Sequence, residues 1–244
     1  MRRISVNADD FGKNNSVNEA VCESFFKGLI NDTTIMVNMP GAKSATAMAG
    51  KYGFGDRVGL HLNLTAGVPF TAAIRECPEF CDLSGNFNAA FHLSNKGRLV
   101  LDQKHREALG AEIEAQIREY LRLGYTRLHL DSHHHVHTDY SVWSVLAPLL
   151  KKYHFKSVRI SRNMYCENEV PNVIKRIYKG GYNALIRAAG LETADYFGSG
   201  ADYEYSKERL KPGSCVEIMV HPLYSQDGRL FDGDRPFTLP GYLQ

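Results

Sequence analysis

The sequence lacks several features that would place it in a specialised class of proteins. No apolar run approaches the roughly 20 residues that a membrane-spanning helix needs. The start, Met1-Arg2-Arg3, leads into only a short apolar segment, so we expect no signal peptide. There is no block of like charges, and the formal net charge is +2. We therefore expect neither nucleic acid nor a membrane among its partners.

The cysteines form no motif that would indicate a disulfide framework or a redox centre. The five are Cys22, Cys77, Cys81, Cys166 and Cys215, an odd number with no CxxC spacing. Reduced, mostly buried thiols are typical of a cytoplasmic protein, and this is the location we expect. A disulfide or a metal site formed by Cys77 and Cys81 is a minor alternative.

The marks of a nucleotide-binding or repetitive protein are also missing. No GxGxxG sequence follows a predicted strand, so dinucleotide binding has no support. We find no internal repeat and no interdomain linker, and 244 residues of which 43% are hydrophobic suit one large domain. We therefore expect a single domain over residues 1–244.

Short β-like segments alternate with helical patterns along the chain, which predicts parallel strands joined by crossover helices. The expected strands are residues 3–7, 33–38, 58–65, 127–131, 157–161, 193–198 and 215–222. The expected helices are residues 16–27 with Ser16 as N-cap, 42–51, 104–123, 142–153 and 171–189. The stretch 66–102 is too long for an ordinary connection, so we interpret it as a functional insertion over the site. Its aromatic residues form either a sugar-stacking lid or a local core; they are Phe70, Phe80, Phe87 and Phe91.

Polar residues stand at the C-terminal end of almost every predicted strand. In chain order they are Asp9 and Asp10, Asn38, His61 and Asn63, Asp131, Arg159, and His221. Each has an ordinary interpretation when taken alone, such as a helix cap, a surface histidine or a salt-bridge partner. Active sites of parallel barrels are built at this face, whereas an open sheet gathers such groups only near a switch point. Their joint occurrence therefore favours a barrel and an enzyme.

The densest of these segments is HLDSHHHVH, residues 129–137, which holds five of the ten histidines. Taken alone it could be a solvated turn or an adventitious metal-binding patch. Together with the aspartates it suits a hydrolytic metal site, because one carboxylate and two neutral imidazoles leave a position for water. Of two adjacent aspartates, one can bind the metal and the other can accept a proton. Such ligands favour zinc, manganese or cobalt, and iron is compatible, whereas magnesium prefers oxygen ligands.

Four segments resemble the YdjC-like carbohydrate deacetylases, the family that includes chitooligosaccharide (diacetylchitobiose) deacetylase. They are VNADDFG (6–12), GLHLNLT (59–65), HLDSHHHVH (129–137) and MVHP (219–222). The resemblance implies an α/β fold, a distorted TIM-like (β/α) barrel with about seven parallel strands. It implies a metal-dependent hydrolase that removes the N-acetyl group from an acetylated amino sugar, most often a chitin-derived oligosaccharide such as diacetylchitobiose.

The resemblance also implies a role for each matching residue. The metal ligands are Asp10, His61 and His133; the base is Asp9, the acid is His221, and Arg159 steadies the base. The remaining polar residues of the motifs either hold the ligands in place or face the substrate; they are Asn63, Asp131, His134, His135 and His137. One divalent ion is implied, and magnesium is commonly assigned in the family although ligand chemistry ranks it lower.

Two other functions stay open at this stage. The same site could deacetylate another N-acetylglucosamine-containing glycan or a lipid, or the protein could bind metal without catalysis. A homodimer is also open. The resemblance departs at the C-terminal end, where family members continue into a further helix and this sequence stops at Gln244. Closure of the barrel is therefore left open by the sequence.

Overall fold

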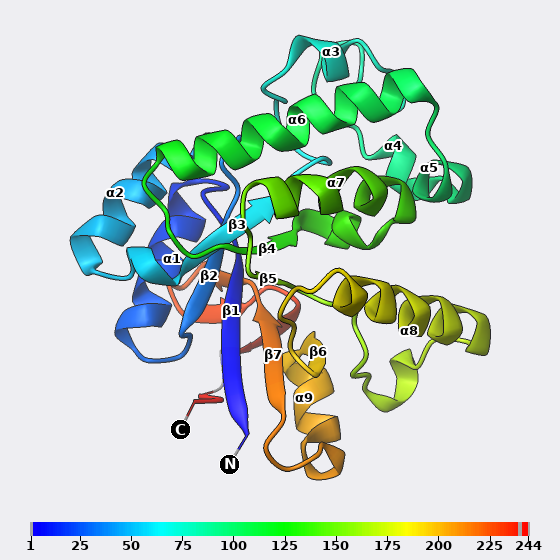
Figure 1. The fold of residues 1–244 in the computed structure, drawn as a ribbon. Helices are drawn as coiled ribbons and strands as arrows, with labels where there is room; N and C mark the ends of the chain where they lie inside the picture. Colours follow the sequence, from blue (N-terminus) through cyan, green and yellow to red (C-terminus); the bar gives the residue numbers. More distant parts are fainter. Residues whose placement is uncertain (1, 239–240, 244) are drawn as a thin grey trace.

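A computed structural model describes residues 2–238 and 241–243. Its main element is a seven-stranded parallel sheet (Figure 1). The strands are β1 (Arg3–Phe11), β2 (Asp32–Ile35), β3 (Val58–Leu62), β4 (His129–Ser132), β5 (Ser157–Val158), β6 (Tyr196–Ser199) and β7 (Cys215–Val220). Their order is β5-β4-β3-β2-β1-β7-β6, so the N-terminal strand lies in the interior of the sheet. β2, β3 and β4 are buried throughout, as expected for parallel strands covered on both faces.

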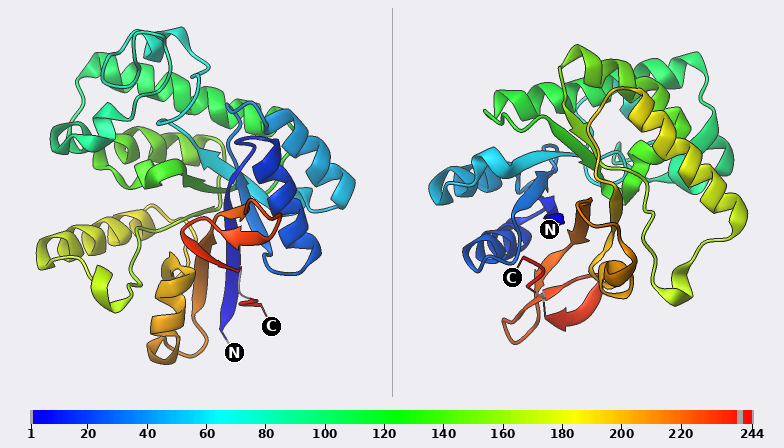
Figure 2. Two further views of the ribbon diagram at one scale, coloured as in Figure 1. Left: turned by 180° about the vertical axis from the view of Figure 1, so that it is seen from behind. Right: turned by 60° about the horizontal axis from the view of Figure 1, so that its bottom comes forward.

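The two edges of the sheet approach each other, which bends it into a distorted barrel (Figure 2, right). Backbone hydrogen bonds join the segment after β5 to the segment around β6, from Val158 N to Glu192 O at 3.1 Å and from Met164 N to Phe197 O at 3.1 Å. The predicted distorted TIM-like barrel with seven parallel strands is confirmed. These irregular backbone contacts, rather than a regular strand pair, link its two edges.

Helices cover the outside of the sheet (Figure 1). The longer ones are α1 (Asn15–Phe26), α2 (Ala42–Tyr52), α6 (Gln103–Arg122), α7 (Tyr140–Lys152), α8 (Val173–Ala188) and α9 (Gly200–Ser206). Single 3₁₀ turns occur at Gly55–Arg57, Glu167–Glu169 and Lys207–Arg209, and a longer one at His133–Thr138. Within the described residues, every helix is too short or too polar to span a bilayer.

The predicted N-cap of the first helix is wrong by two residues. Asn14, not Ser16, is the cap: its backbone is extended and its side chain accepts a hydrogen bond from Val17 N at 3.0 Å. Asparagine and serine are both good caps, so sequence alone does not separate them. The local geometry decides, because the Asn14 oxygen is the one that reaches an amide of the first turn.

The insertion at residues 66–102 folds over α6 and carries three short helices. They are α3 (Ala72–Arg75), α4 (Ala90–Leu93) and α5 (Asn95–Leu99). Phe80, Phe87 and Phe91 are buried inside it, so they form a local core rather than a sugar-stacking lid. Cys77 and Cys81 carry free, buried thiols in the same core, so the disulfide alternative is wrong. Only Phe70 of the four phenylalanines is exposed.

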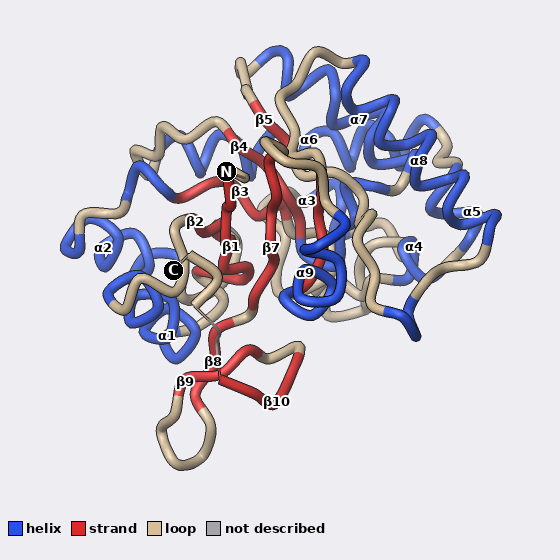
Figure 3. Tube along the Cα trace, turned by 90° about the horizontal axis from the view of Figure 1, so that it is seen from below, coloured by secondary structure: helices blue, strands red, loops and turns tan. Residues whose placement is uncertain are grey.

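A second, antiparallel sheet follows the barrel and was not predicted. It consists of β8 (Pro222–Tyr224), β9 (Leu230–Asp232) and β10 (Arg235–Thr238) (Figure 3). β8 begins two residues after β7 ends, so this sheet stands at the same end of the barrel as His221.

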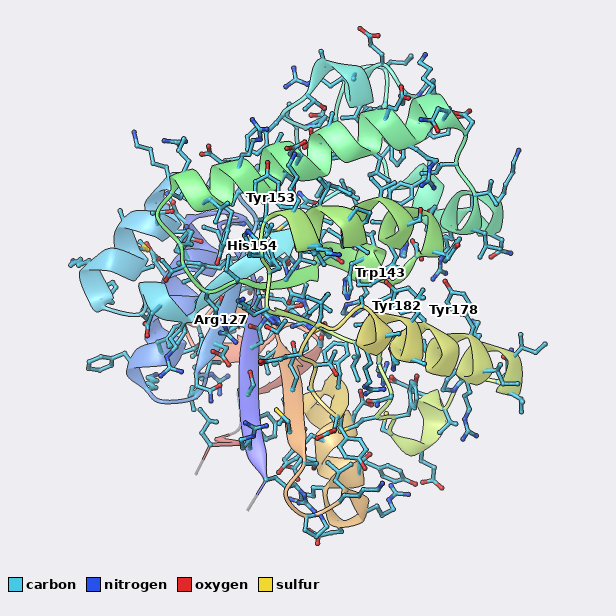
Figure 4. All side chains as sticks on the ribbon, in the orientation of Figure 1. Arg127, Trp143, Tyr153, His154, Tyr178 and Tyr182 are labelled. Atoms are coloured by element: carbon cyan, nitrogen blue, oxygen red, sulfur yellow. The ribbon has the colours of Figure 1, made fainter. Side chains whose placement is uncertain are left out.

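Aromatic side chains tie the outer helices to each other and to the barrel. The rings of Trp143 on α7 and Tyr182 on α8 meet edge to face at 5.8 Å (Figure 4). Tyr182 also donates a hydrogen bond to the carbonyl oxygen of His137. On the other side, the buried Tyr120 of α6 donates to Val58 O at 2.9 Å and also reaches Arg127 O. Val58 is the first residue of β3, and Arg127 lies just before β4.

We expect Tyr120→Phe to lower the free energy of unfolding by about 1–3 kcal/mol, because two carbonyl oxygens lose a buried donor. Tyr153→Phe is the matched control. Its hydroxyl donates to Glu114 near the surface, where water can replace it as the donor. We therefore expect the free energy of unfolding to change by no more than about 0.5 kcal/mol. Urea denaturation of both variants measures the difference, and equal losses would show that the buried hydroxyl does not link α6 to the sheet.

Candidate metal and catalytic site

Three side chains from distant parts of the sequence converge at the C-terminal ends of the strands. Asp10 comes from β1, His61 from β3, and His133 from the segment after β4. His133 Nδ1 lies 2.8 Å from Asp10 Oδ1, and His61 Nε2 lies 3.4 Å from the same oxygen. All three residues are buried. The structure thus brings together the three predicted ligands, with one atom of each directed at a common point.

The chemistry of this cluster fits a divalent cation. Asp10 Oδ1 and His61 Nε2 are buried, and beyond the close contacts within the cluster itself neither has a hydrogen-bond partner among the described residues. A buried polar atom without a partner is costly, so such atoms commonly mark a site for an ion or water. A carboxylate and two imidazoles are the ligand set of hydrolytic zinc and related metals.

The electrostatics of the cluster point the same way. Burial alone would raise the pKa of Asp10, but His133 and His61 offset this and hold it below its usual value. Burial would lower the pKa of His61, yet Asp131 and Asp10 raise it to about 10. A cation binding here must therefore displace a proton from an imidazole, so its affinity falls at low pH.

Asp131 fixes the orientation of His61. His61 Nδ1 donates to Asp131 Oδ1 at 2.7 Å, and the hydroxyl of Thr34 donates to Asp131 Oδ2 at 3.0 Å. With the proton on Nδ1, the Nε2 atom of His61 has a free lone pair for a metal. This carboxylate–histidine arrangement is the usual support for a metal-binding imidazole.

The backbone around Asp10 explains how two adjacent aspartates point in different directions. The β1–β2 pairing shifts register between Ala8 and Phe11, and Asp10 has φ of 67°. Gly12 follows with φ of +90°, and a Cβ there would meet Met36 O at 3.0 Å. A non-glycine residue at positive φ is strained, and such strain collects at functional sites. The irregularity places Asp10 at the cluster and leaves Asp9 inside the barrel.

The predicted base, Asp9, is held by Arg159 through both of its oxygens. Arg159 Nη1 and Nη2 lie 2.6 Å and 2.7 Å from Asp9 Oδ2 and Oδ1, and both residues are buried. Asn7 donates to Asp9 Oδ1 as well, at 2.8 Å. A carboxylate gripped in this way has one fixed orientation. The predicted pairing of Asp9 with Arg159 is therefore present in the geometry.

Arg159 also binds two other carboxylates. Its Nη2 lies 2.7 Å from Asp131 Oδ2, and its Nε lies 2.6 Å from Glu217 Oε1. Burial raises the pKa of Glu217. Glu217 is not among the residues predicted from the sequence, although a charged residue inside the apolar run CVEIMV of β7 is a usable signal.

The predicted acid, His221, is held by the unpredicted antiparallel sheet. Its Nδ1 donates to Asp234 Oδ2 at 2.9 Å, and its backbone N–H donates to Asp232 Oδ1 at 2.9 Å. Burial would lower the pKa of His221, but Asp234 and the charge of Asp9 raise it to about 9. His221 is thus protonated at neutral pH, as a proton donor must be.

The other histidines of HLDSHHHVH have different surroundings. His137 is buried, accepts from Ser132 Oγ at 2.6 Å and donates to Arg159 O at 3.0 Å, so it holds the backbone of the site. His134 and His135 have φ of 53° and 56°, a tight turn that sends their rings to different places. The ring of His134 stacks on His133 at 4.1 Å, and the ring of His135 meets Phe197 edge to face at 5.6 Å. Asn63 donates to Ala66 O and accepts from Ala66 N within its own turn, and it also donates to Asn38 Oδ1 at 3.0 Å.

A cavity of about 850 Å³ opens beside the cluster. The three predicted ligands lie outside its lining, but the residues that follow His133 form part of its wall, as do Phe197, Met219 and Asp234. The opposite walls come from α8 and from the end of the insertion. A volume of this size is that of a typical small-molecule site.

Comparison with known proteins places this site in a family. The profile of the YdjC-like protein family matches residues 3–237. A carbohydrate deacetylase of Halalkalibacterium halodurans is 29% identical over 229 residues, which cover 91% of this chain and 85% of the relative. A carbohydrate deacetylase of Thermoanaerobacter pseudethanolicus is 32% identical over 237 residues, which cover 93% of this chain and 83% of the relative.

The fold has a counterpart among solved structures. The crystal structure of a proposed cellobiose-phosphate cleavage protein of Enterococcus faecalis matches with a TM-score of 0.68 at 22% identity, covering 93% of this chain and 83% of that one. This likeness concerns the fold alone. The profile match over residues 3–237, with relatives that align over nine tenths of the chain, shows that this protein belongs to the YdjC-like family.

Proposed function

We propose that the protein is a metal-dependent hydrolase that removes the N-acetyl group from an acetylated amino sugar. The observation that carries the proposal is the convergence of Asp10, His61 and His133 next to an aspartate that Arg159 grips through both oxygens. The carbohydrate deacetylases among its relatives support the same reaction class.

Each residue has a distinct role in this reaction. A divalent cation held by Asp10, His61 and His133 would acidify water and polarise the amide carbonyl. Asp9 accepts the proton of the attacking water, and Arg159 keeps its carboxylate aimed. His221, protonated at neutral pH, gives a proton to the departing amine as acetate leaves. Asp234 fixes the proton of His221 by accepting from its Nδ1.

We further propose a chitin-derived oligosaccharide such as diacetylchitobiose as the substrate, and zinc, manganese or cobalt as the metal. The cavity supports an oligosaccharide because its volume exceeds what one acetamide group needs. Another N-acetylglucosamine-containing glycan or lipid is the alternative substrate. Metal binding without catalysis accounts less well for the site, because it leaves the Asp9–Arg159 and His221–Asp234 pairs without a purpose.

We expect His61→Ala, His133→Ala and treatment of the wild type with a chelator each to lower acetate release from diacetylchitobiose at least 100-fold. Each of the three would remove the cation. His105→Ala is the matched control. This histidine pairs with Glu79 and Asp102 and is not part of the cavity wall, so we expect activity to stay within two-fold. Undiminished turnover by the metal-free protein or by either ligand variant excludes the mechanism.

The pH dependence of the rate tests His221. Its pKa of about 9 means that the proton donor is present below that pH, so kcat falls as pH rises through 9. A cation at Asp10 repels the imidazolium and moves this limb to somewhat lower pH. In Asp234→Asn the carboxylate that raises the pKa of His221 is gone, so we expect the limb to move down by about one pH unit or more.

The same shift makes a contribution to stability with a defined sign. The folded-state pKa of His221 lies above its usual value of 6.5, so its contribution to stability is complete below pH 6.5 and is lost as pH rises through 9.

Rate profiles of wild type and Asp234→Asn against pH measure the kinetic effect. Identical alkaline limbs in the two proteins would assign the proton donor to another group.

A further inference from the structure

The insertion contributes one wall of the cavity through the segment 90–99, which we call the arm. The arm contains α4 and α5, and Figure 1 shows both beside α7. Three of its polar residues, His92, Asn95 and Arg98, line the cavity across from α8. The proposed mechanism uses none of them.

The arm is fastened to the beginning of α7 by one buried carboxylate. Asp139 is fully buried, and it accepts from His92 Nδ1 at 2.6 Å and from Arg98 Nε at 2.6 Å. Ser141 adds a hydrogen bond to Gly97 O at 2.7 Å. Asp139 lies two residues after the histidine run, so the arm is anchored next to the segment that also carries His133.

These contacts leave one nitrogen of His92 available to a ligand. Because Nδ1 donates to Asp139, the neutral ring carries its proton there and Nε2 is a hydrogen-bond acceptor. Among the described residues no hydrogen bond reaches this Nε2, and the residue faces the cavity. The ring is only partly exposed, so its position is set by the protein rather than by solvent.

A row of rings connects His92 with the cluster. His134 stacks on the predicted ligand His133 at 4.1 Å, and the ring of His92 lies nearly parallel to that of His134, at 6.4 Å and 11°. His92 is therefore two rings away from the reacting centre. A group that binds there belongs to a part of the substrate beyond the acetamide that is cleaved.

We propose that His92 binds the second sugar unit of an oligosaccharide, accepting at Nε2 a hydrogen bond from a hydroxyl or amide N–H, with Asp139 fixing the ring. This inference rests on the proposed function, because it assumes that the acetylated sugar occupies the cavity. The insertion then selects for chain length, whereas the strand ends perform the hydrolysis.

The test compares diacetylchitobiose with N-acetylglucosamine, which has no second unit. His92→Phe keeps the ring and removes its nitrogens. We expect KM for the disaccharide to rise roughly 3- to 10-fold, the loss of one neutral hydrogen bond, with kcat within two-fold and the monosaccharide unaffected. His92→Gln, which restores an acceptor, falls between wild type and His92→Phe.

The control is Ser141→Ala, which loosens the arm without changing the cavity wall. If His92 serves only to anchor the arm, His92→Phe and Ser141→Ala behave alike, losing thermal stability with equal effects on both sugars, and the inference is overturned. An unchanged KM of His92→Phe for the disaccharide overturns it too.

Direct binding separates this inference from the proposed function. Calorimetry measures the affinity of diacetylchitobiose for wild type and for His92→Phe, and acetate release is measured separately. Tighter binding by wild type with no acetate release refutes the proposed function and supports the role of His92. Equal affinities of the two proteins, or no binding by wild type, refute the role of His92.

Discussion

The buried guanidinium of Arg159 is the interaction on which the rest of the site depends. Arg159 follows β5 and binds Asp9 of β1, Asp131 of β4 and Glu217 of β7, all inside the barrel. Phe197 of β6 covers its flat face at 4.6 Å. Taking so many charges out of water is expensive, and leaving one of them unpaired is more so. The carboxylates are therefore held in place by the cost of separating them from Arg159.

This network has consequences on both sides of the reaction centre. Through Asp9 it orients the proposed base, and through Asp131 it reaches His61 and thereby one proposed metal ligand. Arg159 thus couples the proposed base to a proposed metal ligand, although Asp9, Asp131 and His61 come from three different strands. The dense histidine run adds only one proposed ligand, His133, to this arrangement. Of its other histidines, His137 holds the backbone of the site, and His134 and His135 line the cavity.

Much of the framework could be predicted from the sequence because it depends on local patterns. Alternating apolar residues marked the strands, and polar residues just beyond them marked the face where Asp10, His61 and His133 meet. What escaped prediction depends on contacts between distant segments. Glu217 acquires its meaning only opposite Arg159, 58 residues away. Asp234 matters because a hairpin returns it to His221. The backbone hydrogen bonds that link the edges of the barrel likewise depend on segments that meet only in the folded chain. The roles assigned to the site residues remain predictions.

The central claim is that Asp10, His61 and His133 hold a divalent metal ion. A crystal of the protein measured at the absorption edges of zinc, manganese and cobalt tests it most directly. The account predicts an anomalous peak within coordination distance of Asp10 Oδ1, His61 Nε2 and His133 Nδ1, about 2.0–2.2 Å if the ion is zinc. A metal bound elsewhere, with these three side chains hydrogen-bonded only to each other or to water, would contradict it.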